Sequence, residues 1–306
     1  MPCVIDFGSL NMDLSIACER IPQAGETVPG HDFLINPGGK GANQAVAASR
    51  LGAQVFLIGA VGNDVFGKQL VEMLPAAGVD KSEVRILDDI SSGLAMITRT
   101  DSDNRIILNA GANHALGLDE VSESLSRVAH PADIFVTQLE CGYRATLAAL
   151  RKAHDQGLVT LFNPAPAMSL PDSIWDSVDM VCVNETECQT ITGILPTDKA
   201  TIKQGLSWFI KQGVPTAIIT LGDKGAALMQ GEIYLYQPAL EVKVEDTTGA
   251  GDTFIGALAV MVAEHKDREF TLRWASCAAA LTITKVGAQR SIPTRAEVDE
   301  FYSHIG

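Results

Sequence analysis

The sequence is poor in basic residues, and this shortage limits the partners that it can bind. It contains 23 Lys and Arg residues against 37 Asp and Glu residues, so the formal net charge is −14 at pH 7. Nucleic acids and anionic membranes are bound through clustered positive charge, so this composition argues against both as partners. It does not argue against ATP, because a nucleotide needs only a local positive site.

Long hydrophobic runs are also missing. The longest fully apolar stretch, 254–263, is too short to span a bilayer. No basic residue precedes Arg20, and Asp6 interrupts the first apolar run, which argues against a signal peptide. We therefore expect a cytoplasmic protein without a membrane partner.

The motifs of several common metal and nucleotide sites are absent. The six cysteines show no C-x-x-C spacing and lie mostly in apolar surroundings, so we expect reduced, buried thiols and no cysteine-bound metal. Gly8–Asn11 follows the first expected strand without the G-x-G-x-x-G pattern of a dinucleotide-dependent oxidoreductase. The glycine-rich segment 36–44 is not a Walker A loop, because the spacing differs and no Ser or Thr follows Lys40.

One stretch that is present, Asp246–Phe254, combines a glycine turn with two acids. An apolar-alternating segment, 240–244, precedes it and a long apolar helical pattern follows, which predicts a strand, a tight turn and a helix start. Unpaired N–H groups at such a helix start form an anion site. A carboxylate next to a bound anionic phosphate is unfavourable unless it contributes to the reaction. Asp252 could contribute by accepting a proton from an attacking hydroxyl. The alternative is an ordinary acid in a first helical turn, but the two glycines and the second acid favour the catalytic interpretation.

Apolar strand patterns alternate with helical patterns along the chain, which predicts an α/β fold with a doubly wound, mostly parallel sheet. No linker, repeat or low-complexity segment interrupts the pattern, so we expect one domain over 1–306. The expected strands are 2–8, 54–61, 84–87, 134–138, 159–162, 180–183, 217–221, 226–229 and 233–236. The expected helices are 42–51, 66–77, 119–128, 143–154, 201–212, 253–264, 271–285 and a last one that ends near 303.

A few expected strands have no helix between them. They are 14–18, a segment near Phe33, and a hairpin of 94–100 and 105–109 around the turn 101–104. Strands that break the alternation suggest a separate small sheet. We expect it to form a lid from about 13–36 and 93–110 over one end of the site.

Polar residues follow several expected strands, at the edge where an open α/β sheet binds its ligands. Asn11 and Asp13 could hold sugar hydroxyls there, although an Asx-type turn is the simpler explanation of the pair. In 36–44, Lys40 and Asn43 offer donors next to glycines that allow close approach of the backbone. For Asn184 and Glu187, the residues alone favour a helix capping box.

Together, the segments Gly38–Asn43, Asp246–Asp252, Asn11–Asp13, Asn163–Ala167 and Asn184–Glu187 closely resemble those of the PfkB carbohydrate kinase family. The resemblance covers about residues 4–304 in the same order. It implies a Rossmann-like αβα three-layer fold with a β lid. It also implies an enzyme that uses ATP, Mg²⁺ and an activating K⁺, and that often forms a homodimer through the lid.

The resemblance also implies a role for individual residues. Asp252 is the expected catalytic base, and Gly249, Ala250 and Gly251 form the expected anion hole. The residues expected to hold the sugar, besides Asp252, are Asn11, Asp13, Gly39, Lys40, Asn43 and Glu140. Those expected at the nucleotide are Asn184, Thr220, Gly222, Gly225, Gly251 and Ser276, with Glu187 acting on Mg²⁺ through water. Those expected to bind K⁺, mostly by backbone carbonyls, are Asp246, Thr248, Thr282, Lys285, Gly287 and Ser291.

The expected reaction is transfer of the ATP γ-phosphoryl group to O5 of D-ribose. Other kinases of the family, for deoxyribose, fructose or a keto-deoxy sugar acid, remain alternatives. A nucleoside kinase fits less well, because the polar set around Asn11 and Lys40 suits a small free sugar. A non-catalytic sugar or nucleotide sensor would have lost the base, and Asp252 is present.

Overall fold

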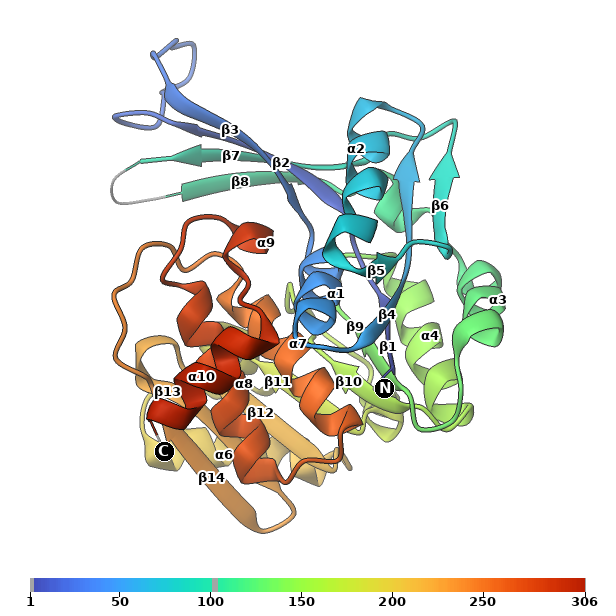
Figure 1. The fold of residues 1–306 in the computed structure, drawn as a ribbon, viewed down its shortest axis with the longest axis vertical. Coiled ribbons are helices and arrows are strands. Elements are labelled where there is room, and N and C mark those ends of the chain that lie inside the picture. The colour runs from blue at the N-terminus through green and yellow to red at the C-terminus, as the bar shows by residue number, and fades with distance from the viewer. Residues whose placement is uncertain (1–2, 101–103, 306) are drawn as a thin grey trace.

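Two β-sheets organise the chain, and both can be followed in Figure 1. The computed structural model describes residues 3–100 and 104–305. In the large sheet the strand order is β14-β13-β12-β11-β10-β9-β1-β4-β5, and β6 also pairs with β4. Its pairs are parallel except for β12 with β13 and β13 with β14. The strands are β1 (Cys3–Phe7), β4 (Gln54–Gly62), β5 (Val79–Asp80), β6 (Val84–Leu87), β9 (Ile134–Thr137), β10 (Val159–Phe162), β11 (Met180–Val183), β12 (Thr216–Thr220), β13 (Gly225–Gln230) and β14 (Ile233–Pro238).

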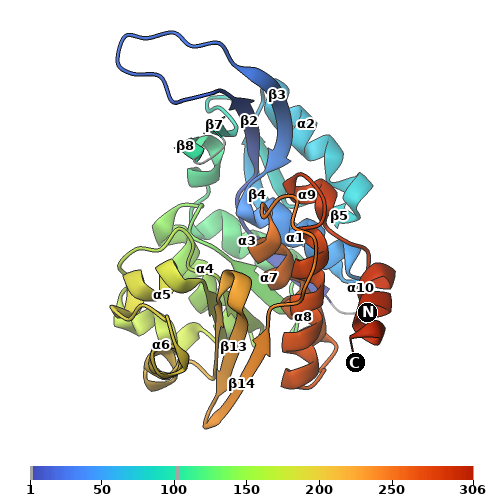
Figure 2. The ribbon, with the colours of Figure 1, turned by 90° about the vertical axis from the view of Figure 1, so that its left-hand side faces the viewer.

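Helices cover both faces of the large sheet, which confirms the expected three-layer αβα fold (Figure 2). One layer contains α1 (Lys40–Arg50), α2 (Val65–Met73), α7 (Ala250–Ala263), α8 (Arg268–Thr282) and α10 (Arg295–His304). The other contains α3 (Leu118–Val128), α4 (Tyr143–Asp155), α5 (Glu185–Thr192) and α6 (Lys199–Lys211). Successive strand residues enter opposite cores, so Val4 packs in the core of α1 and α7 while Ile5 packs in that of α3 and α4.

Short helical turns complete the layers. They are η1 (Pro75–Ala77), η2 (Gly111–His114), η3 (Asp172–Ser177), η4 (Gly222–Lys224) and α9 (Ala288–Ser291). Among the described residues, no helix is long and apolar enough to cross a membrane. All six cysteines have free thiols, and five of them are buried.

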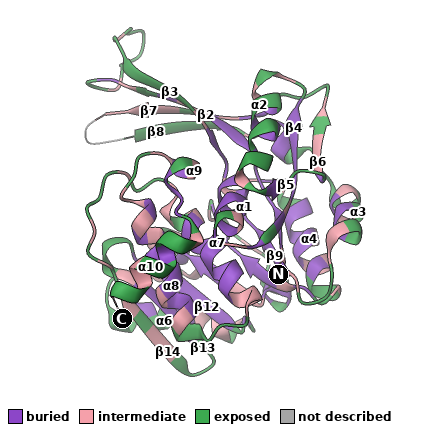
Figure 3. Cartoon of the chain, in the orientation of Figure 1, coloured by how far each residue is buried: buried purple, intermediate pink, exposed green. Residues whose placement is uncertain are grey.

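The second sheet has four strands in the order β3-β2-β7-β8 and extends away from the helical layers (Figure 1). The strands are β2 (Asn11–Ala17), β3 (His31–Gly38), β7 (Gly93–Arg99) and β8 (Asn104–Asn109). These are the segments that broke the β-α alternation, so the inference of a separate small sheet was correct. Of the expected hairpin turn, 101–103 lie outside the described residues. The edge strands β3 and β8 of the small sheet are mainly exposed, whereas the central strands of the large sheet are buried (Figure 3).

The prediction of a strand at 240–244 is wrong. The segment has no strand partner, because β14 already forms that edge of the sheet. Its alternating apolar residues, Leu240, Val242 and Val244, line a cavity instead. The turn that follows is therefore reached from an irregular segment, and α7 begins at Ala250 rather than at Thr253.

Parallel register brings distant segments together at one edge of the large sheet. Thr137 is the register partner of both Phe7 and Phe162. The residues that follow these three strand ends, Gly8, Gln138 and Asn163, therefore leave the sheet side by side. The loops that carry the expected sugar-binding residues start at this edge.

Candidate active site

The first turn of α7 presents unpaired backbone donors. Gly249 has φ +79°, a left-handed conformation that favours glycine, and this residue starts the helix without a side-chain cap. The N–H groups of Gly251 and Asp252 have no backbone partner in the described chain. A Cβ added at Gly251 would meet no atom within 4 Å, so there is open space beside this turn. This is the geometry of an anion site at a helix N-terminus.

Two amides hold the Asp252 carboxylate. Asn43 Nδ2 donates to Oδ2 at 2.9 Å, and Gln44 Nε2 donates to Oδ1 at 3.0 Å. Each oxygen keeps further capacity to accept a hydrogen bond. The carboxylate is therefore fixed next to the anion site and free to receive a proton.

Lys40 is the first residue of α1, and its ammonium lies among carboxylates. Gly39, before it, has φ +91°, and a Cβ there would lie 2.7 Å from the carbonyl oxygen of Ser9, so only glycine fits without a shift. Burial alone would lower the pKa of Lys40, but Asp252, Glu140 and Glu187 outweigh it and raise the pKa. Lys40 is thus a firmly protonated cation at the phosphate side of the site.

Glu140 ties the sugar-side residues together. Its Oε2 accepts from Ser9 Oγ at 2.5 Å, from the backbone N–H of Lys40 at 3.1 Å and from Asn11 Nδ2 at 3.4 Å. Asn113, in η2, donates from Nδ2 to Asn11 Oδ1 at 2.7 Å. The side chain of Asn11 therefore has a fixed orientation before any ligand binds.

Asp13 lies on β2 beside Gly38, whose missing Cβ leaves room for the carboxylate. Burial raises the pKa of Asp13 to about 7, and the nearby carboxylates of Glu140 and Asp252 add to the shift. Three acids thus surround one polar space, and the two others make Asp13 harder to ionise. Such a set is stable when hydroxyl groups donate to it.

The cavity that we expect to hold the transferred phosphate, called the phosphate cavity below, has a volume of about 150 Å³. It brings together residues from α1, the edge of the large sheet and the start of α7. Its lining includes Lys40, Asn163, Asn184, Glu187, Thr220, Gly249, Gly251 and Asp252. Residues that are more than 200 positions apart in the sequence therefore form one small, polar chamber.

Asn184 and Glu187 form the capping box that their spacing predicts. Asn184 Oδ1 accepts from the Glu187 N–H at 2.8 Å, and Glu187 Oε2 accepts from the Asn184 N–H at 2.8 Å. Burial raises the pKa of Glu187, while its hydrogen bond from Asn184 and the charge of Lys40 oppose the shift. Because Glu187 also lines the phosphate cavity, its structural role and its expected role at Mg²⁺ are compatible.

A larger cavity of about 780 Å³ adjoins the phosphate cavity and shares Asn184, Thr220 and Gly251 with it. The expected nucleotide residues Gly222, Gly225 and Ser276 line this cavity too. Sequence reasoning missed its apolar lining. That lining comprises Leu240, Val242, Val244, Phe254, Ala279, Ala280 and Ile283, among others.

The expected cation-binding segments face each other behind the anion site. Asp246 Oδ1 accepts from Thr248 N and Oγ1, at 2.9 and 2.7 Å, and Oδ2 accepts from Gly287 N at 2.9 Å. Although partial burial opposes it, these hydrogen bonds hold the pKa of Asp246 below its usual value. The ammonium of Lys285 donates to Glu297 Oε1 at 3.0 Å and so points to another partner. The group of Lys285 that could bind a cation is its backbone carbonyl.

The other two residues of the expected cation set, Thr282 and Ser291, are buried at the ends of α8 and α9. Each hydroxyl donates to a backbone carbonyl of its own helix. Among the described residues no group of three His, Cys, Asp or Glu side chains is arranged to hold a metal. Backbone carbonyls and one carboxylate suit a weakly held monovalent cation.

Sequence reasoning missed Ser9, Gln44, Asn113 and Gln138, although each contacts a predicted site residue or its network. Ser9 lies in the segment Gly8–Asn11, and Gln44 lies in the segment 36–44. Both are polar residues next to apolar ones, and this pattern could have marked them as candidate site residues. Asn113 gave no such signal. It reaches the site because η2, which follows β8 in the chain, packs against β4 and β7.

Comparison with known proteins agrees with this geometry. The model of the pfkB family of carbohydrate kinases matches residues 1–295. The ribokinase of Haemophilus influenzae is 37% identical over 299 residues, with 97% of each chain covered. A deoxyribokinase of Salmonella typhi is 33% identical over 302 residues, again with 97% of each chain covered. The structure of Arabidopsis thaliana ribokinase complexed with ribose and ATP has a TM-score of 0.89 at 31% identity, with 98% of each chain covered.

The fold and the site thus define a phosphotransferase that uses an alcohol group as acceptor. The chain belongs to the pfkB family of carbohydrate kinases.

Proposed function

We propose that the protein is a ribokinase, which transfers the γ-phosphoryl group of ATP to O5 of D-ribose. The observation that carries the proposal is the continuous polar surface from Asn11 and Glu140 to Asp252. It offers carboxylate and amide partners for several hydroxyls and ends at a base beside an anion site. The ribokinase relatives and the ribose and ATP complex of a related structure support the same substrates.

The residues act by positioning and by charge, because phosphoryl transfer needs little covalent chemistry from a protein. Asp252 accepts the proton of the O5 hydroxyl. The N–H groups of Gly251 and Asp252 and the ammonium of Lys40 stabilise negative charge that spreads over the transferred group. Asn43 and Gln44 keep the Asp252 carboxylate in place.

Mg²⁺ and K⁺ belong to the proposal as well. Glu187 would act on Mg²⁺ through water, and bound Mg²⁺ neutralises charge on the nucleotide phosphates. Asp246, Thr248 and the carbonyls of 282–291 would hold K⁺. Since Asp246 already bonds both Thr248 and Gly287, a cation there would hold the turn before α7 more rigidly.

A deoxyribokinase is the second candidate, because a relative of that name is 33% identical over almost the whole chain. A panel of D-ribose, 2-deoxyribose, fructose and a keto-deoxy sugar acid, with ATP and Mg²⁺ and detection of ADP, separates the candidates. A site that pairs a hydroxyl penalises a substrate without it, since its polar groups stay unpaired. We expect the highest kcat/KM with ribose; a clear preference for 2-deoxyribose or fructose would overturn the assignment.

We also propose a cytoplasmic location. Free, mostly buried thiols suit a reducing compartment, where disulfides are rare. Fractionation of cells that express the tagged protein tests this, and recovery in a secreted or membrane fraction would contradict it.

Ribose binding should strengthen as the pH rises through about 7, which is the pKa of Asp13. The pKa of this acid is raised, so Asp13 is protonated below that pH and ionised above it. The ionised carboxylate accepts hydrogen bonds from sugar hydroxyls at both oxygens, whereas the protonated acid has less capacity to accept. Calorimetric titration with ribose across this range measures the change. Asp13→Asn should bind more weakly and with little pH dependence in this range; an unchanged pH profile in that variant would exclude Asp13 as the source.

K⁺ should raise kcat relative to a large organic cation. The physical reason is that a cation at Asp246 orders the glycine turn and adds positive potential near the phosphates. Initial rates in buffers freed of K⁺, with and without added KCl at constant ionic strength, measure the effect. Equal rates in the two buffers would remove K⁺ from the proposal.

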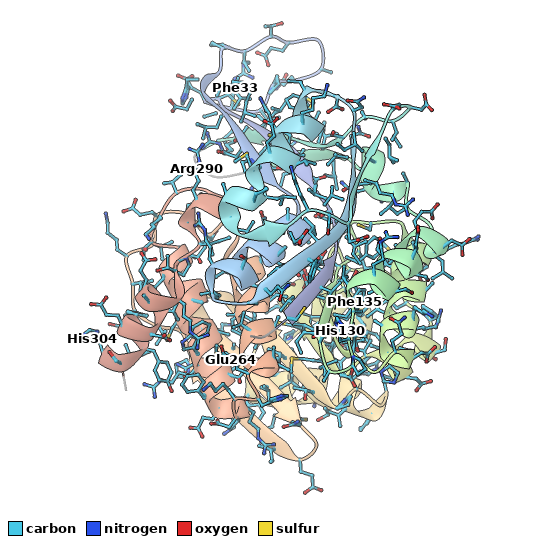
Figure 4. All side chains as sticks on the ribbon, turned by 45° about the vertical axis from the view of Figure 1, so that its right-hand side comes forward. Phe33, His130, Phe135, Glu264, Arg290 and His304 are labelled. Carbon is cyan, nitrogen blue, oxygen red and sulfur yellow. The ribbon has the colours of Figure 1, made fainter. Side chains whose placement is uncertain are left out.

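The small sheet is the proposed lid and dimer surface. Both of its edge strands carry consecutive exposed apolar residues, Phe33–Ile35 on β3 and Ile106–Leu108 on β8. Consecutive strand residues point to opposite faces, so both faces are apolar. Phe33 lies on the outer part of this sheet, well away from α10 and His304 (Figure 4). Exposed apolar surfaces of this kind are normally covered by a ligand or a partner. This supports the proposal that one face of the small sheet covers the sugar and that the other contacts a second copy of the chain.

Ile107→Lys should convert the dimer into a monomer. Ile107 is 72% exposed on the edge strand β8, and a charge there would have to be buried in the dimer. Analytical ultracentrifugation of the variant and the wild type measures the change. Leu118→Lys, an exposed apolar residue on α3, is the matched control and should leave the dimer intact.

A monomeric wild-type protein would contradict the dimer but not the lid. Hydrogen exchange of β2, β3 and β7 with and without ribose tests the lid separately. Equal protection in both states would argue against closure.

A further inference from the structure

Asp6 is a buried acid that the proposed reaction does not use. It is the last but one residue of β1, and its exposed fraction is 0%. Its strand neighbours are the apolar residues Ile5 and Phe7, which face the opposite core. Asp6 therefore shares the face of Val4, where an apolar residue would cost nothing to bury.

Two glutamines connect Asp6 to Asp252. Gln138 Nε2 donates to Asp6 Oδ1 at 3.2 Å and Oδ2 at 3.4 Å, and to Gln44 Oε1 at 2.7 Å. Gln44 Nε2 in turn donates to Asp252 Oδ1 at 3.0 Å. Its second N–H donates to Asn163 Oδ1 at 3.2 Å. The four side chains form one chain of hydrogen bonds from the carboxyl end of β1 to the proposed base.

Several features indicate that Asp6 is a neutral carboxylic acid. Burial raises its pKa well above the usual value, the hydrogen bond from Gln138 opposes this shift in part, and the charge of Asp252 adds to it. The titratable groups that face it are Asp252 on α7 and Cys141 after β9, and neither is a cation.

The surroundings of Gln138 also favour a proton on Asp6. Gln138 Oε1 is buried and has no hydrogen-bond partner. A Cβ at Gly8 would lie 2.6 Å from both this oxygen and Asp6 Oδ1, so both oxygens border Gly8. A carboxyl O–H on Asp6 would add a donor next to this unpaired acceptor, whereas an ionised Asp6 would offer acceptors alone.

We propose that Asp6 is a positioning residue of the kinase reaction, which holds the Gln138 amide in place and, through it, the N–H that Gln44 presents to Asp252. The proposal rests on the proposed function for its kinetic part. An amide side chain can rotate by half a turn and exchange its oxygen for its nitrogen. If Gln138 did so, its oxygen would face Gln44 Oε1, and Gln44 would turn its own oxygen toward the Asp252 carboxylate. Asp6 opposes this turn by holding the amide nitrogen of Gln138 at 3.2 and 3.4 Å, whereas a side chain without polar atoms would leave the amide free to turn.

The kinetic test compares Asp6→Val with Asp6→Asn. Valine packs in a strand but pairs with neither atom of the Gln138 amide, so we expect kcat to fall about tenfold. The KM values for ribose and ATP should stay within about twofold, since neither ligand touches Asp6. Asparagine offers an acceptor and a donor in the same place, so it should restore kcat to within about twofold of wild type.

Thr160→Val is the matched control. Thr160 is as buried as Asp6, and its hydroxyl has three hydrogen-bond partners, Ser177 O, Asp179 Oδ2 and Asp179 N, but it lies outside the site. Its substitution should lower the unfolding temperature and leave kcat unchanged. An Asp6→Val enzyme that also loses only stability would overturn the proposal, because Asp6 would then be merely structural.

A second measurement does not depend on kinase activity or on the folding of Asp6→Val. An acid with a raised pKa in the folded state loses stability as the pH rises from its unfolded pKa, about 3.9, toward its folded pKa. Asp6→Asn carries no such loss. The unfolding temperature of Asp6→Asn minus that of wild type should therefore increase between about pH 5 and pH 8.

A constant difference over this pH range would mean that Asp6 is ionised in the folded protein and would overturn the proposal. The infrared difference spectrum between the two proteins should contain the C=O band of a protonated acid, and a carboxylate band instead would have the same meaning. Failure of wild type in the sugar panel would count against the proposed function alone, because these two readouts need no sugar.

Discussion

Asp252→Asn should lower kcat by about 10²–10⁴-fold, the usual contribution of a general base. The amide keeps the size and polarity of the side chain but cannot accept the O5 proton. Ribose and nucleotide contacts survive, so their binding should stay within a few-fold of wild type. Single-turnover phosphorylation and calorimetric binding of ribose to the same folded variant measure the two quantities.

A matched control distinguishes a base from an ordinary acid at a helix start. Asp267 begins α8 and accepts from the N–H groups of Glu269 and Phe270, with no contact to the site. Asp267→Asn should keep the cap and leave kcat unchanged. If Asp252→Asn behaved in the same way, Asp252 would be a helix-start acid only, and the proposed mechanism would be wrong.

Lys40→Met should lower kcat by about 10²–10³-fold, the loss expected when one donor to developing negative charge is removed. Methionine retains most of the stem that packs in the phosphate cavity. The ammonium also balances Asp252, Glu140 and Glu187. We therefore expect its loss to raise the pKa of Glu187 further and to weaken ATP binding. Steady-state kinetics with varied ATP measure both effects.

The matched control for Lys40→Met is Lys68→Met, which removes an exposed ammonium from α2. It should leave kcat and the KM for ATP unchanged, because salt screens the interactions of exposed charges that lie outside the site. A small effect at Lys40, similar to that at Lys68, would show that Lys40 does not face the transferred group.

Much of the fold could be predicted from the sequence because its signals are local. The strands and helices were expected within a few residues of where they lie, since periodic apolar residues, glycine turns and capping residues act over one or two turns of chain. The capping boxes at Asn184 and Thr294 are examples, with both hydrogen bonds in place. The prediction of a strand at 240–244 failed because alternation shows only that one side of a segment is apolar. It does not show that another strand is available to pair with it.

Candidate site residues could also be identified where several functional groups stand close together in the sequence. The turn at Asp246–Asp252 and the segment Gly38–Asn43 are rich in glycine and polar residues. Each of them by itself therefore indicated a binding site. Their pairing was supplied by a family resemblance rather than by either motif. In the structure Asn43 and Asp252, which are 209 positions apart, share a hydrogen bond.

The tertiary structure alone decided how these pieces meet and what each group experiences. Parallel register brings the ends of β1, β9 and β10 to one edge, and this places Asp6, Gln138 and Gln44 in one network. In the sequence Asp6 only interrupts an apolar run. Burial raises its pKa and the charge of Asp252 adds to the shift, and such surroundings exist only in the packed fold. The sequence by itself therefore determined the elements, the turn chemistry and the candidate residues, while distances, burial and protonation needed the packed fold, because they depend on contacts between segments far apart in the chain.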